Sequence, residues 1–207
     1  MSQVPSNLLR QPTTILLLRH GETAEPDVFH GSESDIGLGP NGRKQAEQVA
    51  AKLVLRRPDA VYCSGLRRSF ETAEPIAAAC GRPLQIEPDL RERAMGALSG
   101  FSRVEGWPIY EETKARWMAG DLDYTHEGAE SFAEIQTRAL PALLRIASRH
   151  EGGVVVVVGH GVANRVLILS LVEGFSPADF DAITIEFVKV SELTFDGEAW
   201  RLVIRQS

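Results

Sequence analysis

The sequence predicts an α/β fold, a three-layer sandwich with a mostly parallel central sheet flanked by helices. Two short apolar runs, Thr14–Leu18 and Val154–Val158, are typical of strands buried on both faces, and a polar turn containing glycine follows each of them. Ala60–Cys63 and Leu84–Ile86 are weaker strand candidates. Helical patterns fill the intervals between these runs, and such alternation favours a parallel sheet with helices on its faces.

Five stretches have the periodicity of helices, and they cover residues 42–56, 67–79, 103–119, 131–149 and 162–172. The fourth has a defined start, because Ser131 and Glu134 are spaced as a capping box that satisfies two backbone amides at a helix start. Pro75 and Pro141 fall inside helical patterns, so we expect a kink or a helix end at each of them.

The C-terminal segment alternates apolar and polar residues in three runs, Ile183–Phe187, Val190–Phe195 and Trp200–Ile204. An Asp196-Gly197 turn would join the last two runs as a hairpin. We expect these runs to be antiparallel strands at the edge of the sheet. The sequence shows no internal repeat, low-complexity tract or linker, and residues 1–207 are therefore predicted to form one domain.

Composition limits the classes of partner. A net charge of −6 and a pI near 5.4 argue against broad nucleic-acid binding, so an anionic ligand must meet a local cluster of cations. The start of the chain lacks a basic segment followed by a long apolar stretch, and Val154–Val158 is far too short to span a bilayer. Cys63 and Cys80 have neither disulfide density nor metal-ligand spacing. We therefore expect a cytoplasmic protein without a membrane anchor.

Both buried runs end in a histidine motif. Arg19-His20-Gly21-Glu22-Thr23 follows the first run, where open α/β sheets bind ligands beyond the carboxyl ends of their strands. An imidazole can attack phosphorus, a guanidinium can bind phosphate oxygens in pairs, and glycine lets the backbone approach a ligand. Gly159-His160-Gly161 follows the second run in the same context. Two histidines at the ends of neighbouring strands indicate one shared site.

These motifs resemble those of the histidine phosphatase superfamily, the phosphoglycerate mutase-like group, from Ile15 to about Gly174. Three further segments match in the family's order: Ser64–Ala73, Leu90–Gly100 and Gly128–Ser131. The resemblance implies a phosphoglycerate mutase-like sandwich that transfers a phosphoryl group through a phosphohistidine.

The resemblance also implies a role for each matched residue. His20 is the nucleophile, and His160 is the second histidine at the transferring phosphoryl group. Glu92 is the acid that protonates the leaving oxygen and then the base that activates water. The phosphate pocket is completed by four further residues, namely Arg19, Arg68, Thr23 and Gly161.

Some neighbours of the motifs keep two interpretations. Arg165 either binds substrate or anchors its helix in an ion pair. Several family members carry an asparagine shortly after the first motif; this chain has none there, and His30 is a hypothetical substitute for it. The insertion after Gly100 carries large side chains that either line a lid or pack internally: Trp107, Tyr110, Trp117 and Met118.

Four polar residues near the motifs stay outside the predicted catalytic set. Glu22 belongs to the first motif without an assigned role. Arg67 is expected in solvent, and so is His150, at a helix end. A helix cap alone explains Ser131.

The sequence thus predicts a phosphomonoester hydrolase that acts on a small phosphorylated metabolite, without metal or cofactor, since its histidines do not have zinc-ligand spacing. A phosphoglycerate mutase-type transfer is the alternative, because both reactions share the phosphoenzyme. A non-catalytic phosphate-binding module is less favoured, since every matched catalytic position is occupied. A homodimer stays open. An unprotonated His20 at attack and a protonated Glu92 at departure predict an acidic to neutral optimum.

Overall fold

A six-stranded sheet forms the middle layer of the computed structural model, which describes residues 11–204. Its spatial order is β3-β2-β4-β1-β5-β6. The strands β1 to β4 run parallel, whereas β5 and β6 run antiparallel to their neighbours. The six strands are β1 (Thr13–Arg19), β2 (Ala60–Cys63), β3 (Leu84–Ile86), β4 (Val154–Gly159), β5 (Val190–Phe195) and β6 (Trp200–Ile204).

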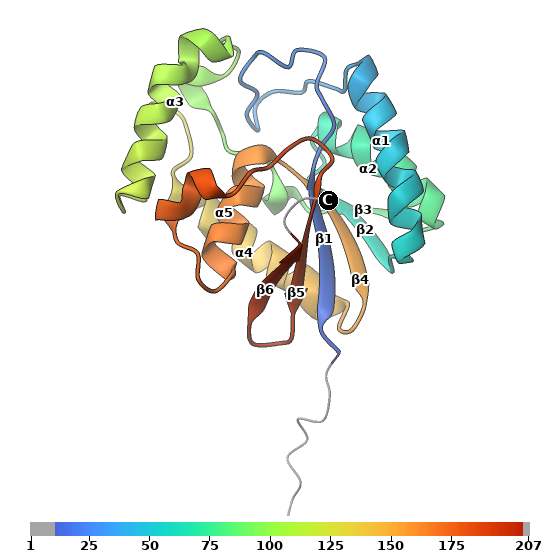
Figure 1. Cartoon of the computed structure of the whole chain (residues 1–207). Coiled ribbons are helices and arrows are strands. Elements are labelled where there is room, and N and C mark those ends of the chain that lie inside the picture. The colour runs from blue at the N-terminus through green and yellow to red at the C-terminus, as the bar shows by residue number, and fades with distance from the viewer. Residues whose placement is uncertain (1–10, 205–207) are drawn as a thin grey trace, which may run out of the picture.

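Helices cover both faces of this sheet, and the predicted three-layer sandwich is confirmed (Figure 1). The helices α1 (Pro40–Leu53) and α2 (Arg67–Cys80) pack on one face, and α4 (Phe132–Arg149) and α5 (Gly161–Leu171) pack on the other. Above the carboxyl ends of the strands lies α3 (Arg103–Met118) (Figure 1). Short 3₁₀ helices occupy Val54–Arg56, Pro88–Leu90, Gly96–Leu98 and Pro177–Ala182.

The alternation of side chains along β1 explains why it reads as a continuous apolar run. Ile15 and Leu17 pack into the core beneath α4 and α5, whereas Leu16 and Leu18 pack beneath α1 and α2. All four side chains are at most 1% exposed. A strand covered on both faces needs apolar residues at every position, and the polar chemistry is therefore confined to its end.

Neither of the two helical prolines ends its helix, so the expectation of a helix end at these positions is wrong. Pro75 lies inside α2 and Pro141 lies inside α4, and both helices continue past them. Each helix buries side chains before and after its proline, among them Ala73 and Ile76 in α2. This burial against the sheet outweighs the one backbone hydrogen bond that a proline removes.

The tail forms two of its three expected strands. The β5–β6 hairpin is present, and Asp196 accepts backbone hydrogen bonds from Glu198 and Ala199 across its turn. Residues 183–187 do not form a strand; only Phe187 makes an isolated bridge, to Arg19. The hydrogen-bonding edge of β1 is already occupied by β5, so this segment crosses the end of the sheet as a loop with Ile183 and Ile185 buried.

Two further expectations concern cysteine and the membrane. Both cysteines are unpaired, with Cys63 buried in the sheet and Cys80 half-buried. Within residues 11–204, no helix combines the length and the apolar character that crossing a bilayer requires.

Candidate active site

Strand register places the two motif histidines side by side. Arg19 of β1 pairs with Gly159 of β4, so the next residues along these parallel strands, His20 and His160, leave the sheet as neighbours. Their ring centroids lie 5.2 Å apart. One shared site at the carboxyl end of the sheet therefore joins residues that are 140 positions apart in the sequence.

His20 is held in one tautomer by its own neighbour. Its Nδ1 lies 2.7 Å from the carbonyl oxygen of Gly21, which can only accept, so Nδ1 carries the proton and Nε2 carries the free electron pair. Burial, and then the positive charges of Arg19 and Arg68, hold the pKa of His20 well below its ordinary value of 6.5. The imidazole is therefore neutral, as a nucleophile must be.

His160 lies fully buried behind His20. Its Nε2 is 2.7 Å from the hydroxyl of Ser64, which follows the neighbouring strand β2, and its backbone amide donates to Asn164 Oδ1. Its Nδ1 is buried and has no hydrogen-bond partner in the described part of the chain. Burial, followed by the charge of Arg68, holds the pKa of His160 well below 6.5. An anionic ligand beside this ring would favour its protonation and could accept a hydrogen bond from Nδ1.

Arg19, half-buried at the end of β1, carries the first of two guanidinium groups near His20. Its Nη1 donates to the carbonyl of Ile185 at 3.3 Å, and its guanidinium lies over the ring of Phe187 at 4.0 Å. Its buried Nε has no partner among residues 11–204. Burial lowers the pKa of Arg19 to about 10, so it stays charged at neutral pH with a free donor.

Arg68, at the start of α2, is the second guanidinium and is 1% exposed. It donates to the carbonyls of Ser34 and Gly31, both at 2.9 Å, which fixes the loop over the site. One turn along α2, Thr72 accepts from the amide of Gly21 at 2.9 Å. This one helix thus positions both an arginine and the backbone beside the nucleophile.

Glu92 is buried at the amino end of α5, although charge runs such as its own usually lie in solvent. Its carboxylate accepts from the amides of Val162 and Ala163 at 3.2 and 3.0 Å. These amides belong to the first turn of the helix and have no partner within it, which explains why a carboxylate is stable there.

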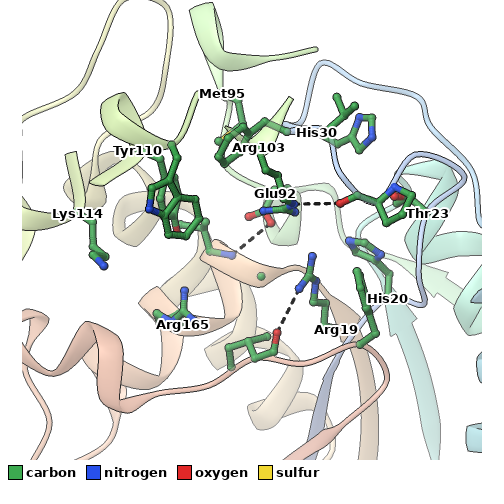
Figure 2. Close-up of a pocket in the computed structure, with 18 of the residues that line it drawn as sticks. Arg19, His20, Thr23, His30, Glu92, Met95, Arg103, Tyr110, Lys114 and Arg165 are labelled. Carbon is green, nitrogen blue, oxygen red and sulfur yellow. Dashed lines mark hydrogen bonds between the residues drawn. The ribbon is translucent and has the colours of Figure 1, made fainter. Parts of the chain in front are cut away.

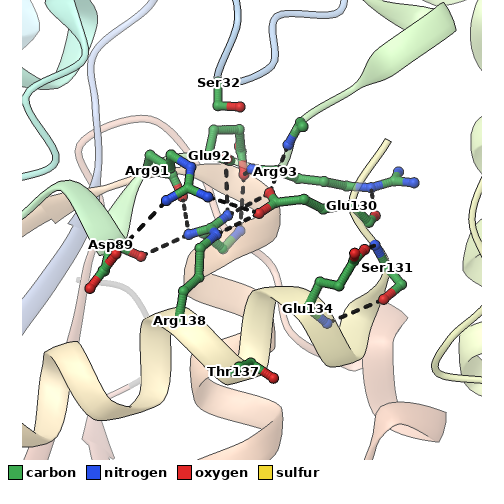
Figure 3. Close-up of polar contacts among 12 residues, drawn as sticks. Ser32, Asp89, Arg91, Glu92, Arg93, Glu130, Ser131, Glu134, Thr137 and Arg138 are labelled. Atoms are coloured by element: carbon green, nitrogen blue, oxygen red, sulfur yellow. Dashed lines mark hydrogen bonds and ion pairs between the residues drawn. The ribbon is translucent and has the colours of Figure 1, made fainter. Parts of the chain in front are cut away.

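A network around Glu130 and Arg138 supports the turn that carries Glu92 (Figure 3). Arg138 of α4 donates to the carbonyls of Asp89, Arg91 and Glu92 at 2.8 to 3.1 Å. Its guanidinium also binds both carboxylate oxygens of Glu130, at 2.7 and 2.8 Å. The capping box of Ser131 and Glu134 is confirmed at the start of the same helix.

Thr23 and Gly161 both line the cavity at the site. A Cβ atom on Gly161 would lie 3.6 Å from the Arg19 guanidinium and from a Glu92 oxygen. Gly161 therefore lies between these two groups, but a larger residue would also fit there. Gly21 differs, because its Cβ would lie 2.7 Å from the backbone of Gly42. The need for glycine at position 21 thus arises from packing against α1 and not from a ligand.

The cavity has a volume of about 320 Å³ and opens in front of His20 (Figure 2). His20 and Thr23 form one side of it, and Arg165, Lys114 and Tyr110 face them from the other side. Tyr110 and Trp107 line the cavity, whereas Trp117 and Met118 pack into the core. The two interpretations of the insertion therefore apply to different residues.

Several lining residues were missed from the sequence. Arg103 and Lys114 come from the helical pattern of the insertion, where the polar face of a helix gives no sign of a cavity. Phe187 ends a run that the sequence predicts to be an edge strand, and Phe180 lies in a segment to which the sequence assigns no role. Ser64 was visible as the first residue of a matched motif, yet only its contact with His160 shows what it does.

The remaining candidates have structural partners. His30 lines the cavity, but its ring nitrogens bind Ser34 and the carbonyl of Glu25, at 3.0 and 2.9 Å. Glu22 bonds to Asn41 on the surface. Arg67 is exposed and pairs with Glu71, as expected. His150 is half-buried rather than in solvent, because its Nε2 bonds the hydroxyl of Tyr62 at 3.0 Å.

This arrangement can transfer a phosphoryl group. A neutral imidazole with a free Nε2 lies beside the guanidinium groups of Arg19 and Arg68, which suit the charge on phosphoryl oxygens. A buried carboxylate lines the same cavity and can exchange a proton with a leaving oxygen. In the described residues no cluster of three histidine, cysteine or acidic side chains is spaced to hold a metal ion.

Comparisons with known proteins identify the family. The model of the histidine phosphatase superfamily (branch 1) matches residues 15–206. A metal-independent phosphoserine phosphatase from Arabidopsis thaliana is 35% identical over 194 residues, which cover 91% of this chain and 81% of the relative. Phosphoglycerate mutase-like protein 4 from the same plant is 35% identical over 198 residues, which cover 92% and 83%.

Solved structures agree with this match. The mycobacterial glucosyl-3-phosphoglycerate phosphatase bound to VO3 superposes with a TM-score of 0.82 at 25% sequence identity. The alignment covers 95% of this chain and 98% of that one. The likeness therefore extends over nearly the whole chain.

Proposed function

This chain belongs to the histidine phosphatase superfamily, branch 1, and from that premise we propose that it hydrolyses small phosphomonoesters through a phosphohistidine on His20. The observation that carries the proposal is the state of His20. Its Nδ1 donates to the carbonyl of Gly21, which leaves the electron pair of Nε2 free, and Arg19 and Arg68 line the cavity around it. Two relatives are named as phosphatases of small phosphorylated metabolites, which supports hydrolysis as the outcome.

The proposed reaction has two steps. His20 Nε2 attacks phosphorus while the bond to the ester oxygen breaks, and Glu92 gives a proton to that leaving oxygen. Water then attacks the phosphohistidine, Glu92 takes back a proton, and phosphate leaves with His20 regenerated. Arg19, Arg68 and a protonated His160 bind the phosphoryl oxygens in both steps, with Thr23 and Gly161 shaping the pocket.

The test is phosphate release from a panel of phosphomonoesters in the presence of EDTA, for the wild type and for His20→Ala. We expect release that EDTA does not reduce and that falls to background in the variant. Arg68→Gln should lower kcat roughly 10²- to 10³-fold. The control is Arg67→Gln, at the exposed neighbouring residue, and its kcat should stay near that of the wild type. Release that persists in folded His20→Ala would overturn the proposal.

The mutase alternative is tested in the same samples with 3-phosphoglycerate. Isomerisation without release of phosphate would favour the mutase, whereas release without isomerisation supports the phosphatase. If neither assay shows activity while the folded protein still binds inorganic phosphate, a non-catalytic binding module would be favoured.

Four sequence expectations stay predictions. A single domain over residues 1–207 predicts one cooperative unfolding transition, and a homodimer is checked by light scattering on the purified protein. The cytoplasmic location and the absence of a metal are checked by cell fractionation and by elemental analysis.

A further inference from the structure

Two buried serines extend from His160 away from the nucleophile, and the reaction proposed above gives them no role. Ser64 follows β2, and Ser69 lies in the first turn of α2. The two hydroxyl oxygens are 2.8 Å apart, and Ser64 Oγ is 2.7 Å from Nε2 of His160. All three side chains are at most 4% exposed. Bulk water therefore does not compete for the bonds of this serine pair.

The far end of the serine pair fixes the direction of each hydrogen bond. Ser69 Oγ lies 2.8 Å from the carbonyl oxygen of Leu66, which can only accept, so the Ser69 hydroxyl donates there. Ser69 Oγ is then left to accept from Ser64. Ser64 in turn accepts from Nε2 of His160. The single proton of the neutral His160 ring is therefore on Nε2, and Nδ1 carries the free electron pair.

The order of the strands leaves Nδ1 of His160 as the atom that a phosphoryl group can contact. Ser64, His160 and His20 follow β2, β4 and β1, which are neighbours in that order. The His160 ring thus lies between Ser64, which its Nε2 contacts, and the His20 ring, 5.2 Å away. Its Nδ1 is buried and has no hydrogen-bond partner among residues 11–204.

The groups around His160 keep its ring neutral in the free protein. Burial is the largest cause that lowers its pKa, and nearby groups lower it further. The only carboxylate at the site, that of Glu92, accepts from backbone amides of α5 instead. Next to Ser69, burial raises the pKa of the Cys63 thiol, which therefore stays protonated. The groups that lower the pKa of His160 after burial are Arg68 on α2, His20 and Arg19 at the end of β1, and Arg138 on α4.

A fully ionised phosphoryl group does not fit this arrangement. Its oxygens and the Nδ1 atom of His160 would face one another with electron pairs only, so a proton must lie between them. A phosphomonoester has a second pKa of about 6, so its monoanion carries such a proton at acidic to neutral pH.

We propose that the serine pair links phosphate binding to one proton: the ester binds as its monoanion, and the proton of its P–OH group goes to Nδ1 of His160. The O–H bond breaks and an N–H bond forms, which leaves a dianionic phosphoryl group beside an imidazolium. The proton stays on His160 through both steps and leaves with the product, phosphate monoanion. Ser64 and Ser69 are positioning residues, because they act through the ring of His160. This inference rests on the phosphatase function proposed above and specifies the ionic form of its substrate.

Calorimetry with two inorganic anions counts the protons without any turnover. At pH 6 sulfate is a dianion, whereas most inorganic phosphate is the monoanion. Titrations in two buffers that differ in ionisation enthalpy give the number of protons taken up per anion bound. For the wild type at pH 6 we expect about one proton per sulfate and far less per phosphate, and about one per phosphate at pH 8. Sulfate that binds without proton uptake would overturn the proposal.

Variants of the serine pair test its control over the ring. In Ser64→Ala the Nε2 proton loses its acceptor, so the neutral ring can carry its proton on Nδ1 and donate it to the anion. In Ser69→Ala the freed hydroxyl of Ser64 can donate to Nε2, with the same result. We expect sulfate at pH 6 to bind to both variants with much less proton uptake. Uptake equal to that of the wild type in both would overturn the role of the pair.

Two further variants are matched controls. Ser170→Ala removes a hydroxyl that accepts from Gln136 at 2.9 Å, at the far end of α5, and should keep the uptake of the wild type. Glu92→Gln tests the rival position of the proton, and it should also keep the uptake. Loss of the uptake in Glu92→Gln would place the proton on that carboxyl group and overturn the proposal.

The outcomes separate this inference from the function on which it rests. Proton-linked binding of sulfate without release of phosphate from any ester would count against the phosphatase alone. Hydrolysis of esters by a protein that binds sulfate without proton uptake would overturn the inference alone. The wild-type comparison of the two anions decides even if no serine variant folds.

Discussion

A single backbone contact fixes the tautomer of the His20 imidazole. Its Nδ1 proton goes to the carbonyl of Gly21, and Gly21 is itself fixed, because its amide donates to Thr72 and its Cα packs against Gly42. The lone pair of Nε2 is then the only nucleophilic position on the ring.

This tautomer predicts which nitrogen is phosphorylated. When the protein is mixed with substrate and quenched in base, we expect the phosphoryl group on Nε2 of His20, as read from ³¹P–¹⁵N couplings in NMR. A phosphoryl group on Nδ1 would mean that the bond to Gly21 is broken during the reaction and would refute the assignment.

At the scale of elements, α4 supports the turn that presents Glu92. Arg138 binds three carbonyls of that turn and the carboxylate of Glu130, which also accepts from the amide of Ala94 and from the guanidinium of Arg91. Arg138 does not line the cavity but binds the carbonyl of Glu92, so we expect it to act on the reaction mainly through the position of Glu92.

Arg138→Gln should therefore impair proton donation more than phosphate binding. We expect kcat for an alkyl phosphate to fall roughly 10- to 100-fold, but kcat for p-nitrophenyl phosphate to fall much less, because that leaving group needs no proton. Arg149→Gln, on the same helix, is the matched control, since Arg149 is exposed and its side chain has no hydrogen-bond or ion-pair partner within residues 11–204. Equal losses for both substrates would indicate a merely structural role.

The junction of β1 and α1 depends on close backbone packing. A Cβ atom on Gly42 would overlap the carbonyl of Glu22, whereas one on Gly161 would meet only ordinary contacts at 3.6 Å. Gly42→Ala should thus lower the free energy of unfolding by about 1–3 kcal/mol, as overpacking does. Gly161→Ala should leave it unchanged in the same urea titration, and a similar loss in both variants would contradict this account.

At the scale of the whole molecule, two neutral histidines are buried in the interior, and their burial makes the stability depend on pH. Burial keeps the pKa of His20 and of His160 well below 6.5 in the folded state. Below about pH 6.5 the unfolded chain binds protons that the folded chain does not bind. The free energy of unfolding therefore falls as the pH drops below 6.5, and it continues to fall until the folded-state pKa values are reached.

Each such histidine contributes a slope of up to about 1.4 kcal/mol per pH unit in this window. We expect urea unfolding at pH 7.5 and pH 5.5 to show a smaller loss of stability for His160→Gln than for the wild type. Identical losses would show that His160 takes up its proton in the folded protein.

The sequence by itself determined the layers of this fold and the centre of its candidate site. A strand buried on both faces must be apolar throughout, so the polar motifs at Arg19-His20 and at His160 stood out as strand ends, and the ordered motifs located Arg68 and Glu92.

Only the tertiary structure decided which side chains surround them. Residues 183–187 have the alternation of a strand, yet they cross the sheet end and place Phe187 beneath Arg19, because β5 already occupies the edge of β1. Arg103 reaches the cavity from the polar side of its helix, where the sequence gives no sign of a cavity. The physical reason is that periodicity reports whether a residue is buried, whereas its partner is set by contacts between distant parts of the chain.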